Sequence, residues 1–398
     1  MNIKIAFLSH VDFNLYLFRL PVMVKLVEEG WEIYAICPKG RVSERFKDFG
    51  IKHIAYDVER KSLNPFKEIK TIYNLYKVLK PLDLDILHTF TSKPNIYGTL
   101  AGRLARVPII INLVEGLGSL YIENNFKARL VRNIMELLYS FAFRLADKVI
   151  VINPDDMNYF IDKRILPSQK AILIKGVGID TEDFSRANVN KNSVKDLRIE
   201  LNIDKDQVVV LMVARLLVHK GVLEYLKSAE ALKQKYNNKV EFLLVGDFDL
   251  GNPYNISNEI LQDFVSRGIV KFLGWRDDIK ELLALCDIFV LPSYYREGIP
   301  RTLLEAASMG KPIVTTNTIG CKEVVENGKN GFLVPIKDYI SLAKSIEILV
   351  NNEDIRRAFG EYSREKVIRE FEIRKVVEQY LKLYNDLLNE KKNEKPKA

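Results

Sequence analysis

The feature that most constrains the fold is an alternation of short apolar runs with longer helical patterns, which occurs in two successive blocks. In the first block, runs rich in Val and Ile stand at 3–9, 31–38, 52–58, 84–90, 108–115, 147–153 and within 170–184. In the second block, similar runs stand at 207–215, 240–247, 269–275, 287–293, 311–317 and 331–335. Nearly continuous apolar runs separated by helices are typical of parallel sheets covered on both faces. The pattern predicts an α/β protein of two Rossmann-like, doubly wound domains.

Chain length and one polar segment indicate where these domains divide. At 398 residues the chain is too long for one ordinary core. Residues 186–206 are polar and weakly patterned, and we interpret them as a linker region. We expect an N-terminal domain over 1–187 and a C-terminal domain over 188–370, with a helix over 371–390 packing back on the first. Ligands of such sheets bind beyond the carboxyl ends of the strands, here expected in the cleft between the domains.

Composition narrows the class of protein. The chain is 47% hydrophobic and 28% charged, and no apolar run approaches the ~18 residues that span a bilayer. Its three cysteines and four histidines are scattered, so we expect neither a metal site nor a cofactor. Residues 1–187 hold 27 Lys and Arg against 21 Asp and Glu, while the remainder holds 33 against 31. A basic N-terminal half suits a polyanionic partner, but no nucleic-acid-binding motif accompanies it.

Two loops of the second domain carry candidate ligand-binding side chains at predicted strand ends. In ARLLVHKG, Arg215 and Lys220 flank a strand-to-helix turn, where two cations suit a diphosphate. Cations in turns are usually just solvated, so this signal is weak alone. In LGWRDDI, Gly274 would let the backbone approach a flat ligand, which Trp275 or Arg276 would cover. A tryptophan in such a place is more often a core residue.

A third loop, in REGIPRTLLEAASMG, places Glu297 before a predicted helix and Glu305 two turns inside it. Glu297 is a candidate acceptor for sugar hydroxyls, and Glu305 can accept both hydroxyls of a ribose diol. The amides at the helix start would face a phosphate. The other candidate donor-binding residues of this segment are Gly298, Ile299, Arg301 and Thr302. For each glutamate alone, a capping or helix-surface role is the better explanation.

Together these motifs resemble those of the retaining nucleotide-sugar glycosyltransferases of family 4, which have an E-x7-E motif and two Rossmann-like domains (the GT-B fold). The resemblance implies that Arg215 and Lys220 hold the pyrophosphate of the donor, Glu305 its ribose and Glu297 its sugar. It also implies metal-independent, front-face transfer, in which the departing diphosphate takes the acceptor proton. The usual Gly-Gly pair before EVV is Gly320-Cys321 in this chain.

The N-terminal half narrows the resemblance. RKSLNPFKEI, SKPNIYGTLAGRLARVP and LVEGLGSLYIENNFKARLVR are similar to N-acetylgalactosaminyltransferases that extend undecaprenyl-diphosphate-linked diacetylbacillosamine in bacterial protein N-glycosylation. This similarity implies a UDP-N-acetylgalactosamine donor, or more broadly a UDP-N-acetylhexosamine, and an α-1,3 bond. A related hexosaminyltransferase of O-antigen or capsule assembly, using UDP-N-acetylglucosamine or another donor, is the alternative.

The acceptor side offers fewer signals. Glu115 stands where many family members have a histidine, and it is a candidate to orient the acceptor hydroxyl or accept its proton. A structural role for Glu115 is equally open. A polyprenyl acceptor implies a membrane surface, for which the basic amphipathic segment 124–148 is suited, although a core helix with a basic edge explains it too. The candidate membrane and acceptor residues are Asn14, Lys61, Lys67, Lys127, Arg129 and Arg132.

We therefore expect a cytoplasmic enzyme that is peripherally associated with the inner face of the plasma membrane. Two hypotheses of other kinds compete with it. A UDP-sugar 2-epimerase has the same two-domain shape but needs acid/base groups facing the sugar and no basic amphipathic helix. A two-lobed solute-binding protein would close on a sugar without chemistry, and such proteins usually carry an export signal, which the start MNIKIAFLSH does not resemble.

Overall fold

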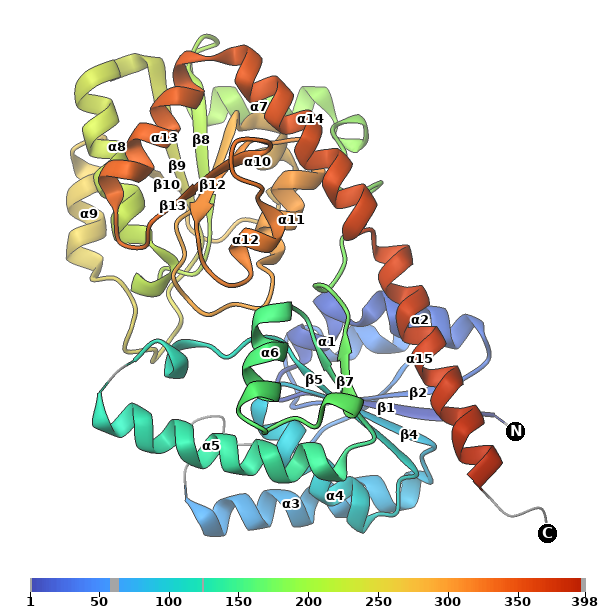
Figure 1. Ribbon diagram of the computed structural model, residues 1–398. Helices are drawn as coiled ribbons and strands as arrows, with labels where there is room; N and C mark the ends of the chain where they lie inside the picture. Colours follow the sequence, from blue (N-terminus) through green and yellow to red (C-terminus); the bar gives the residue numbers. More distant parts are fainter. Residues whose placement is uncertain (1, 58–63, 124, 395–398) are drawn as a thin grey trace. The chain divides into compact units, whose positions relative to one another are not determined.

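The structure, a computed structural model, describes residues 2–57, 64–123 and 125–394 (Figure 1). It divides into two compact units. Unit 1 comprises Met1–Gly178 together with Ile373–Ala398, and unit 2 comprises Ile179–Glu372. The chain therefore starts in unit 1, builds all of unit 2, and returns to unit 1 with its last helix (red in Figure 1).

Unit 1 is built on a seven-stranded parallel sheet in the order β3-β2-β1-β4-β5-β6-β7. The strands are β1 (Lys4–Leu8), β2 (Glu32–Ile36), β3 (Lys52–Ile54), β4 (Ile86–Phe90), β5 (Ile109–Val114), β6 (Lys148–Val151) and β7 (Ala171–Leu173). The central strands β4 and β5 are buried along their whole length, which is why their sequences are continuous rather than alternating apolar runs. Strand order reverses between β1 and β4, so the loops after these two strands diverge at one edge of the sheet.

Helices cover both faces of this sheet. The α-helices of unit 1 are α1 (Asp12–Phe18), α2 (Leu20–Glu28), α3 (Pro65–Leu79), α4 (Thr99–Leu104), α5 (Phe126–Leu145), α6 (Pro154–Asp162) and α15 (Ile373–Glu394). One face packs on α2 and α15, through residues such as Met23 and Tyr384. The other face packs on helices α3 to α6, through residues such as Leu75 of α3 and Phe143 of α5. Asn side chains cap α3, α5 and α6 by accepting backbone N–H bonds.

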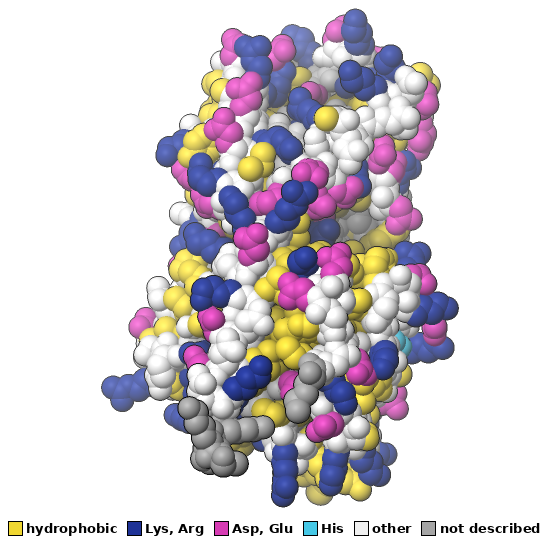
Figure 2. Space-filling view, turned by 90° about the vertical axis from the view of Figure 1, so that its right-hand side faces the viewer, with side chains coloured by type: hydrophobic (Ala, Val, Ile, Leu, Met, Phe, Trp, Pro, Cys, Tyr) yellow, Lys and Arg dark blue, Asp and Glu magenta, His cyan; other side chains and the backbone are white. Residues whose placement is uncertain are grey.

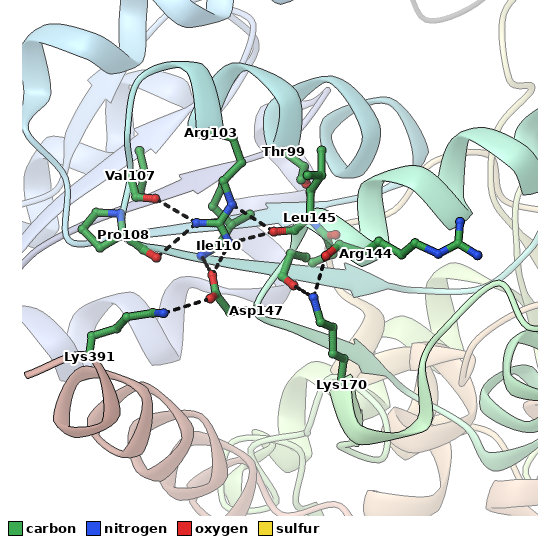
Figure 3. Close-up of polar contacts among 12 residues, drawn as sticks. Thr99, Arg103, Val107, Pro108, Ile110, Arg144, Leu145, Asp147, Lys170 and Lys391 are labelled. Atoms are coloured by element: carbon green, nitrogen blue, oxygen red, sulfur yellow. Dashed lines mark hydrogen bonds and ion pairs between the residues drawn. The ribbon is translucent and has the colours of Figure 1, made fainter. Parts of the chain in front are cut away.

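A polar cluster fixes the end of α5 to the amino edge of the sheet (Figure 3). The Arg103 guanidinium donates to the carbonyl oxygens of Leu145, Val107 and Pro108 and pairs with Asp147 at 2.6 Å. The same Asp147 carboxylate accepts the Ile110 N–H at 2.8 Å. Lys391 of α15 lies 3.7 Å from it, and Lys170 donates to the last carbonyl groups of α5. These bonds satisfy groups that a helix end leaves unpaired.

Unit 2 repeats the architecture with a six-stranded parallel sheet in the order β10-β9-β8-β11-β12-β13. Its strands are β8 (Val208–Val213), β9 (Val240–Val245), β10 (Lys271–Phe272), β11 (Ile288–Leu291), β12 (Ile313–Thr316) and β13 (Gly331–Val334). Its α-helices are α7 (Lys191–Glu200), α8 (Val222–Tyr236), α9 (Asn258–Ser266), α10 (Ile279–Leu285), α11 (Arg301–Ser308), α12 (Cys321–Val324), α13 (Tyr339–Asn351) and α14 (Glu353–Glu370). The order reverses between β8 and β11, and the prediction of two doubly wound parallel sheets is confirmed.

The linker interpretation of 186–206 is wrong, because this segment folds as part of unit 2. Asn190 caps α7, and Leu197, Leu201 and Ile203 are buried in the core of the unit. Leu197 lies in α7 and the other two directly after it, so these buried side chains hold the segment although Ile199 of the same helix is 73% exposed. The low average hydrophobicity of the segment concealed this one-sided pattern.

The surface carries both signs of charge. On the face drawn in Figure 2, Lys and Arg side chains alternate with Asp and Glu side chains, and apolar atoms gather in the lower half. The net charge of +8 is thus not spread as a uniform positive field over this face. A basic surface has to be sought on individual helices.

Candidate active site

Lys220 and Glu297 form an ion pair at the carboxyl end of the unit 2 sheet. Lys220 ends the short 3-10 turn Val218–Lys220 after β8, and Glu297 lies in the loop after β11. The Lys220 Nζ lies 2.7 Å from Glu297 Oε2, and Ser293 Oγ donates a 2.7 Å hydrogen bond to Oε1. The two charged side chains are only 12% and 13% exposed. Both carboxylate oxygens therefore have a fixed position.

Two glycines let the loops around this pair approach one another. Gly221 has a φ of +78°, and a Cβ there would lie 2.2 Å from the carbonyl oxygen of Pro292. Gly320 has a φ of +85°, and a Cβ there would lie 2.0 Å from the carbonyl oxygen of Gly298. Both positions need glycine for its conformation and for its lack of a side chain. Gly320 thereby brings the start of α12 against the loop that carries Glu297.

Cys321 is the position at which the chain departs from the family's Gly-Gly pair. It begins α12 and is fully buried, and burial raises the pKa of its thiol to about 11. The thiol is therefore protonated at neutral pH. The departure leaves glycine at Gly320, where the backbone contact requires it, and places a small apolar group next to it.

Arg301 and Glu305 lie one turn apart on α11 and bond to one another. The Arg301 Nε lies 2.8 Å from Glu305 Oε1. Glu305 is buried, and this burial raises the pKa of its carboxyl, an effect that the Arg301 cation offsets only in part. Gly298 and the buried Ile299 precede the helix, and Thr302 lies in its first turn. The predicted donor-binding segment thus joins the loop after β11 to α11.

Arg215 makes its ion pair with a residue outside the predicted motifs. Its Nη1 lies 2.7 Å from Asp249 Oδ2, which also accepts a 3.0 Å bond from Asn252. Arg215 remains 47% exposed, whereas Lys220 is largely buried. Each of the two predicted diphosphate-binding cations therefore has a carboxylate partner of its own. Within the part of the chain that the structure describes, His, Cys, Asp and Glu side chains form no group of three that could hold a metal ion.

The Gly274–Arg276 loop is placed after β10. Gly274 has a φ of +65°, and its carbonyl oxygen accepts a 2.9 Å bond from the Gly246 N–H at the end of β9. Trp275 is 58% exposed, so its interpretation as a core residue is wrong. Arg276 pairs with Asp278 at 2.6 Å and with Glu200 at 3.0 Å, and these bonds raise its pKa. In this structure Arg276 ties the loop to α7.

Glu115 is the centre of a polar group at the carboxyl end of the unit 1 sheet. It follows β5 and accepts two bonds from Asn14 Nδ2, at 2.9 and 2.8 Å. Ser9, which follows β1, donates a 3.2 Å bond to Asn14 Oδ1 and thereby orients the amide. The buried Arg19 forms an ion pair with the same carboxylate. Sequence reasoning proposed Glu115 and Asn14 separately, and the structure brings them together.

Sequence reasoning missed three residues near the switch between β1 and β4. Arg19 is the first, and its only signal is a lone cation in the apolar stretch LYLFRLPV. The others are His10 and Thr91, whose Nδ1 and Oγ1 atoms are 2.5 Å apart. Thr91 has a φ of +71°, which is rare for a β-branched residue and marks a strained position. No sequence pattern reports a positive φ at a threonine.

The candidate membrane residues lie in different surroundings. Lys127 and Arg129 are exposed on α5, and Lys67 is exposed on α3. Arg132, by contrast, donates to the carbonyl oxygens of Leu120 and Glu123 and lies over the ring of Tyr121. It therefore holds the loop that precedes α5. Lys61 falls outside the described residues.

Two family models match this chain. Residues 4–153 match the family described as "Glycosyl transferase 4-like". Residues 193–366 match the family described as "Glycosyl transferases group 1". The first match covers most of the unit 1 sheet, and the second begins in α7 and ends in α14.

Individual relatives match over almost the whole length. The chain is 38% identical over 385 residues to the N,N'-diacetylbacillosaminyl-diphospho-undecaprenol alpha-1,3-N-acetylgalactosaminyltransferase of Campylobacter jejuni, covering 97% of this chain and 99% of that one. It is 29% identical over 366 residues to the UDP-Gal:alpha-D-GlcNAc-diphosphoundecaprenol alpha-1,3-galactosyltransferase of Escherichia coli, covering 91% of each.

Solved structures share the fold. A glycosyltransferase from Rickettsia africae superposes with a TM-score of 0.81 at 19% identity, covering 97% of this chain and 98% of that chain. Alr3699/HepE of Anabaena in complex with UDP gives 0.76 at 21% identity, covering 97% and 100%.

Proposed function

Because the chain belongs to family 4 of the glycosyltransferases, we propose that it transfers N-acetylgalactosamine from UDP-N-acetylgalactosamine to undecaprenyl-diphosphate-linked diacetylbacillosamine. The product carries an α-1,3 bond and serves protein N-glycosylation. Family membership decides against the solute-binding and epimerase hypotheses. The observation that carries the proposal is the 38% identity to the Campylobacter jejuni enzyme, which extends over 99% of that enzyme.

The donor half of the proposal rests on unit 2. Breaking the bond between sugar and diphosphate develops negative charge on the departing phosphate, which nearby cations stabilise. Lys220 and Arg215 supply these cations after β8, and donor binding would share Lys220 between Glu297 and the diphosphate. Glu297, with both oxygens fixed, accepts bonds from hydroxyl groups of the sugar. Glu305 accepts the ribose diol.

The acceptor half rests on unit 1. The acceptor hydroxyl attacks the anomeric carbon on the face that the diphosphate leaves, so the configuration is retained. The bond to the diphosphate breaks as the new bond forms, and the departing UDP takes the proton of the hydroxyl. Before transfer, Glu115 accepts a hydrogen bond from that hydroxyl and so orients its oxygen, because Asn14 and Arg19 fix the carboxylate at the strand end. As the bond to the diphosphate breaks, this proton passes from the hydroxyl to the departing UDP and not to Glu115.

We also propose that α5 and α3 place the enzyme on an anionic membrane surface. Both helices expose a stripe of apolar side chains at helical spacing. On α5 the stripe is Phe126, Leu130, Ile134, Leu137 and Phe141, and on α3 it is Phe66, Ile69 and Tyr73. None of the helices that the structure describes is long and apolar enough to cross a bilayer. Contact would therefore be made by helices lying along the headgroups.

The charges of α5 and α3 support the same proposal. Glu136, the one acidic residue of α5, pairs with Lys163 at 3.0 Å and is only 12% exposed. Glu68, the one acidic residue of α3, pairs with Lys93 at 2.8 Å and is equally buried. The carboxylates of both helices are therefore neutralised by the body of unit 1. Their exposed charges are cations, each worth about 1 kcal/mol near anionic lipid.

The test is a transfer assay with the purified protein and undecaprenyl-diphosphate diacetylbacillosamine. Radiolabelled UDP-N-acetylgalactosamine, UDP-N-acetylglucosamine and UDP-galactose are supplied separately, with EDTA present, and label is counted in the organic phase. We expect label from UDP-N-acetylgalactosamine alone. Label from only one of the other donors would overturn the proposed sugar. No label from any donor, with UDP still bound, would overturn the acceptor.

A further inference from the structure

Arg19 is among the largest fully buried side chains of the protein, with 1% of its surface exposed. It stands between α1 and α2, at the junction of the two helices. The guanidinium carbon lies 4.7 Å from the centre of the Phe90 ring, at the end of β4. A cation at this place is held by an aromatic face on one side and needs an anion on another.

Glu115 is that anion. The Nη2 of Arg19 forms the ion pair with Glu115 Oε1, while its Nε and Nη1 have no hydrogen-bond partner among the described residues. Glu115 is 21% exposed, so the pair joins a buried cation to a carboxylate that reaches the surface. The arginine therefore acts on one group, and that group lies at the carboxyl end of β5.

This arrangement is hard to explain as a stabilising contact. Removing a guanidinium from water costs several kcal/mol, and the attraction to a single partner rarely offsets that cost. Apolar residues of similar volume therefore often stabilise a core as much as a buried ion pair or more. Two buried nitrogens without partners add to that cost. What the pair does provide is a fixed position for Glu115, since Arg19 itself cannot move without leaving its packed site.

The C-terminal helix completes the surroundings of Arg19. Tyr384 of α15 lies 2.7 Å from His88 Nδ1 through its hydroxyl, and the His88 ring lies 4.3 Å from the Phe90 ring. Tyr380 of the same helix also lies against His88, with 5.8 Å between the ring centres. Burial and the Arg19 cation lower the pKa of His88 well below its usual range. His88 is therefore neutral and adds no second positive charge beside Arg19.

We infer that Arg19 is a positioning residue for transfer, which holds Glu115 where the acceptor hydroxyl binds. Helix α15 supports Arg19 indirectly, because Tyr380 and Tyr384 pack on His88, which lies against Phe90. This inference rests on the proposed function. Asn14 fixes the same carboxylate from α1, so Glu115 is held from two directions. The acceptor site of unit 1 then depends on residues from both ends of the chain.

The experiment compares Arg19→Met, Arg19→Lys, Glu115→Gln and the double variant Arg19→Met/Glu115→Gln in the transfer assay. We expect Arg19→Met to lower kcat about 100-fold, as a misplaced group does, with the Kd for UDP changed less than about threefold. Arg19→Lys should recover most of the rate, because it restores the cation. The double variant should lose no more than Glu115→Gln alone, since both changes remove one interaction.

Arg103→Met is the matched control, because Arg103 bonds before the start of β5 and Glu115 follows its end. It should lower stability and leave kcat unchanged. A normal kcat in Arg19→Met, or losses that multiply in the double variant, would overturn the inference. If Arg19→Met does not fold, Arg19→Lys and Asn14→Ala decide it, and wild-type kcat in Asn14→Ala would overturn it. A wild-type enzyme without transfer would instead overturn the proposed function, and the acceptor role of Glu115 with it.

Discussion

Lys220 and Glu297 meet in one ion pair of 2.7 Å, although one residue follows β8 and the other follows β11. The cation expected at the diphosphate and the carboxylate expected at the sugar are thus neighbours before any donor binds. Donor binding would then redistribute an existing pair of charges, so that neither charge is buried without a partner.

Glu297→Gln should separate catalysis from nucleotide binding. The amide keeps the volume of the side chain and loses its charge, so transfer should fall about 100- to 1,000-fold, or about 3–4 kcal/mol. The Kd for UDP should stay equal or fall, because Lys220 no longer forms an ion pair with a carboxylate that competes with the diphosphate. Steady-state kinetics and calorimetric titration with UDP measure the two effects. An equal loss of transfer rate and of UDP affinity would make Glu297 a structural residue.

Gly320→Ala should destabilise unit 2 through a contact that its backbone cannot avoid. The new Cβ would meet the Gly298 carbonyl oxygen at 2.0 Å, and overpacking adds about 1–3 kcal/mol to the strain of a positive φ. Gly328→Ala is the matched control, because it has a φ of +77° with nothing within 4 Å of the new Cβ. Urea unfolding should show the larger loss for Gly320→Ala. Equal losses would mean that the Gly298 contact can relax.

Donor affinity should depend on pH through Glu305. Burial raises the pKa of this carboxyl above its usual range, and the ionised form is the one that accepts the ribose diol. Affinity is therefore full above the raised pKa and falls as the pH drops through it, by up to about tenfold per pH unit. UDP-N-acetylgalactosamine binding, measured by calorimetry between pH 8 and pH 4.5, checks this. Glu305→Gln should bind more weakly without that decline, and a parallel decline would assign it to another group.

Membrane binding should depend on the exposed cations of α5. Lys127→Glu/Arg129→Glu removes two lipid contacts and should weaken partitioning to anionic liposomes at least about 30-fold, from about 1 kcal/mol per cation. Lys191→Glu/Lys195→Glu on α7 makes the same change of net charge on an exposed helix of unit 2 and should have little effect. Sedimentation with liposomes measures both. Similar losses in the two variants would point to net charge alone.

Much of the fold, and part of the candidate site, could be predicted from sequence because these features depend on short stretches of the chain. The buried strands appear as apolar runs, as in IIINLV of β5, and their parallel order follows from the helices between them. The segment with Glu297 and Glu305 is also local, since the spacing of the two residues along one loop and helix is visible in the chain. The place of each glutamate within its own segment could therefore be predicted from sequence, whereas the binding roles of Glu297 and Glu305 stay predictions.

Contacts between distant segments could not be predicted. Arg19 and Glu115 are 96 residues apart, and nothing in LYLFRLPV shows that its arginine is buried against a carboxylate. The partner of Arg215 is Asp249, which lies 34 residues further along the chain and outside every predicted motif. Arg132 is a cation on an amphipathic helix, yet its guanidinium donates hydrogen bonds to carbonyl oxygens of the preceding loop. Only coordinates distinguish such pairs from solvated charges.

The return of α15 to unit 1 sets an order on folding during synthesis. Residues 1–178 leave the ribosome first, but the core that they form includes Val376, Tyr380 and Tyr384, which are translated last. Unit 2 is complete as soon as residue 372 has emerged, so the domain that is made second is the first able to finish folding. A nascent chain without α15 would expose an apolar face of unit 1 for the whole of that interval, which is the kind of surface that chaperones recognise.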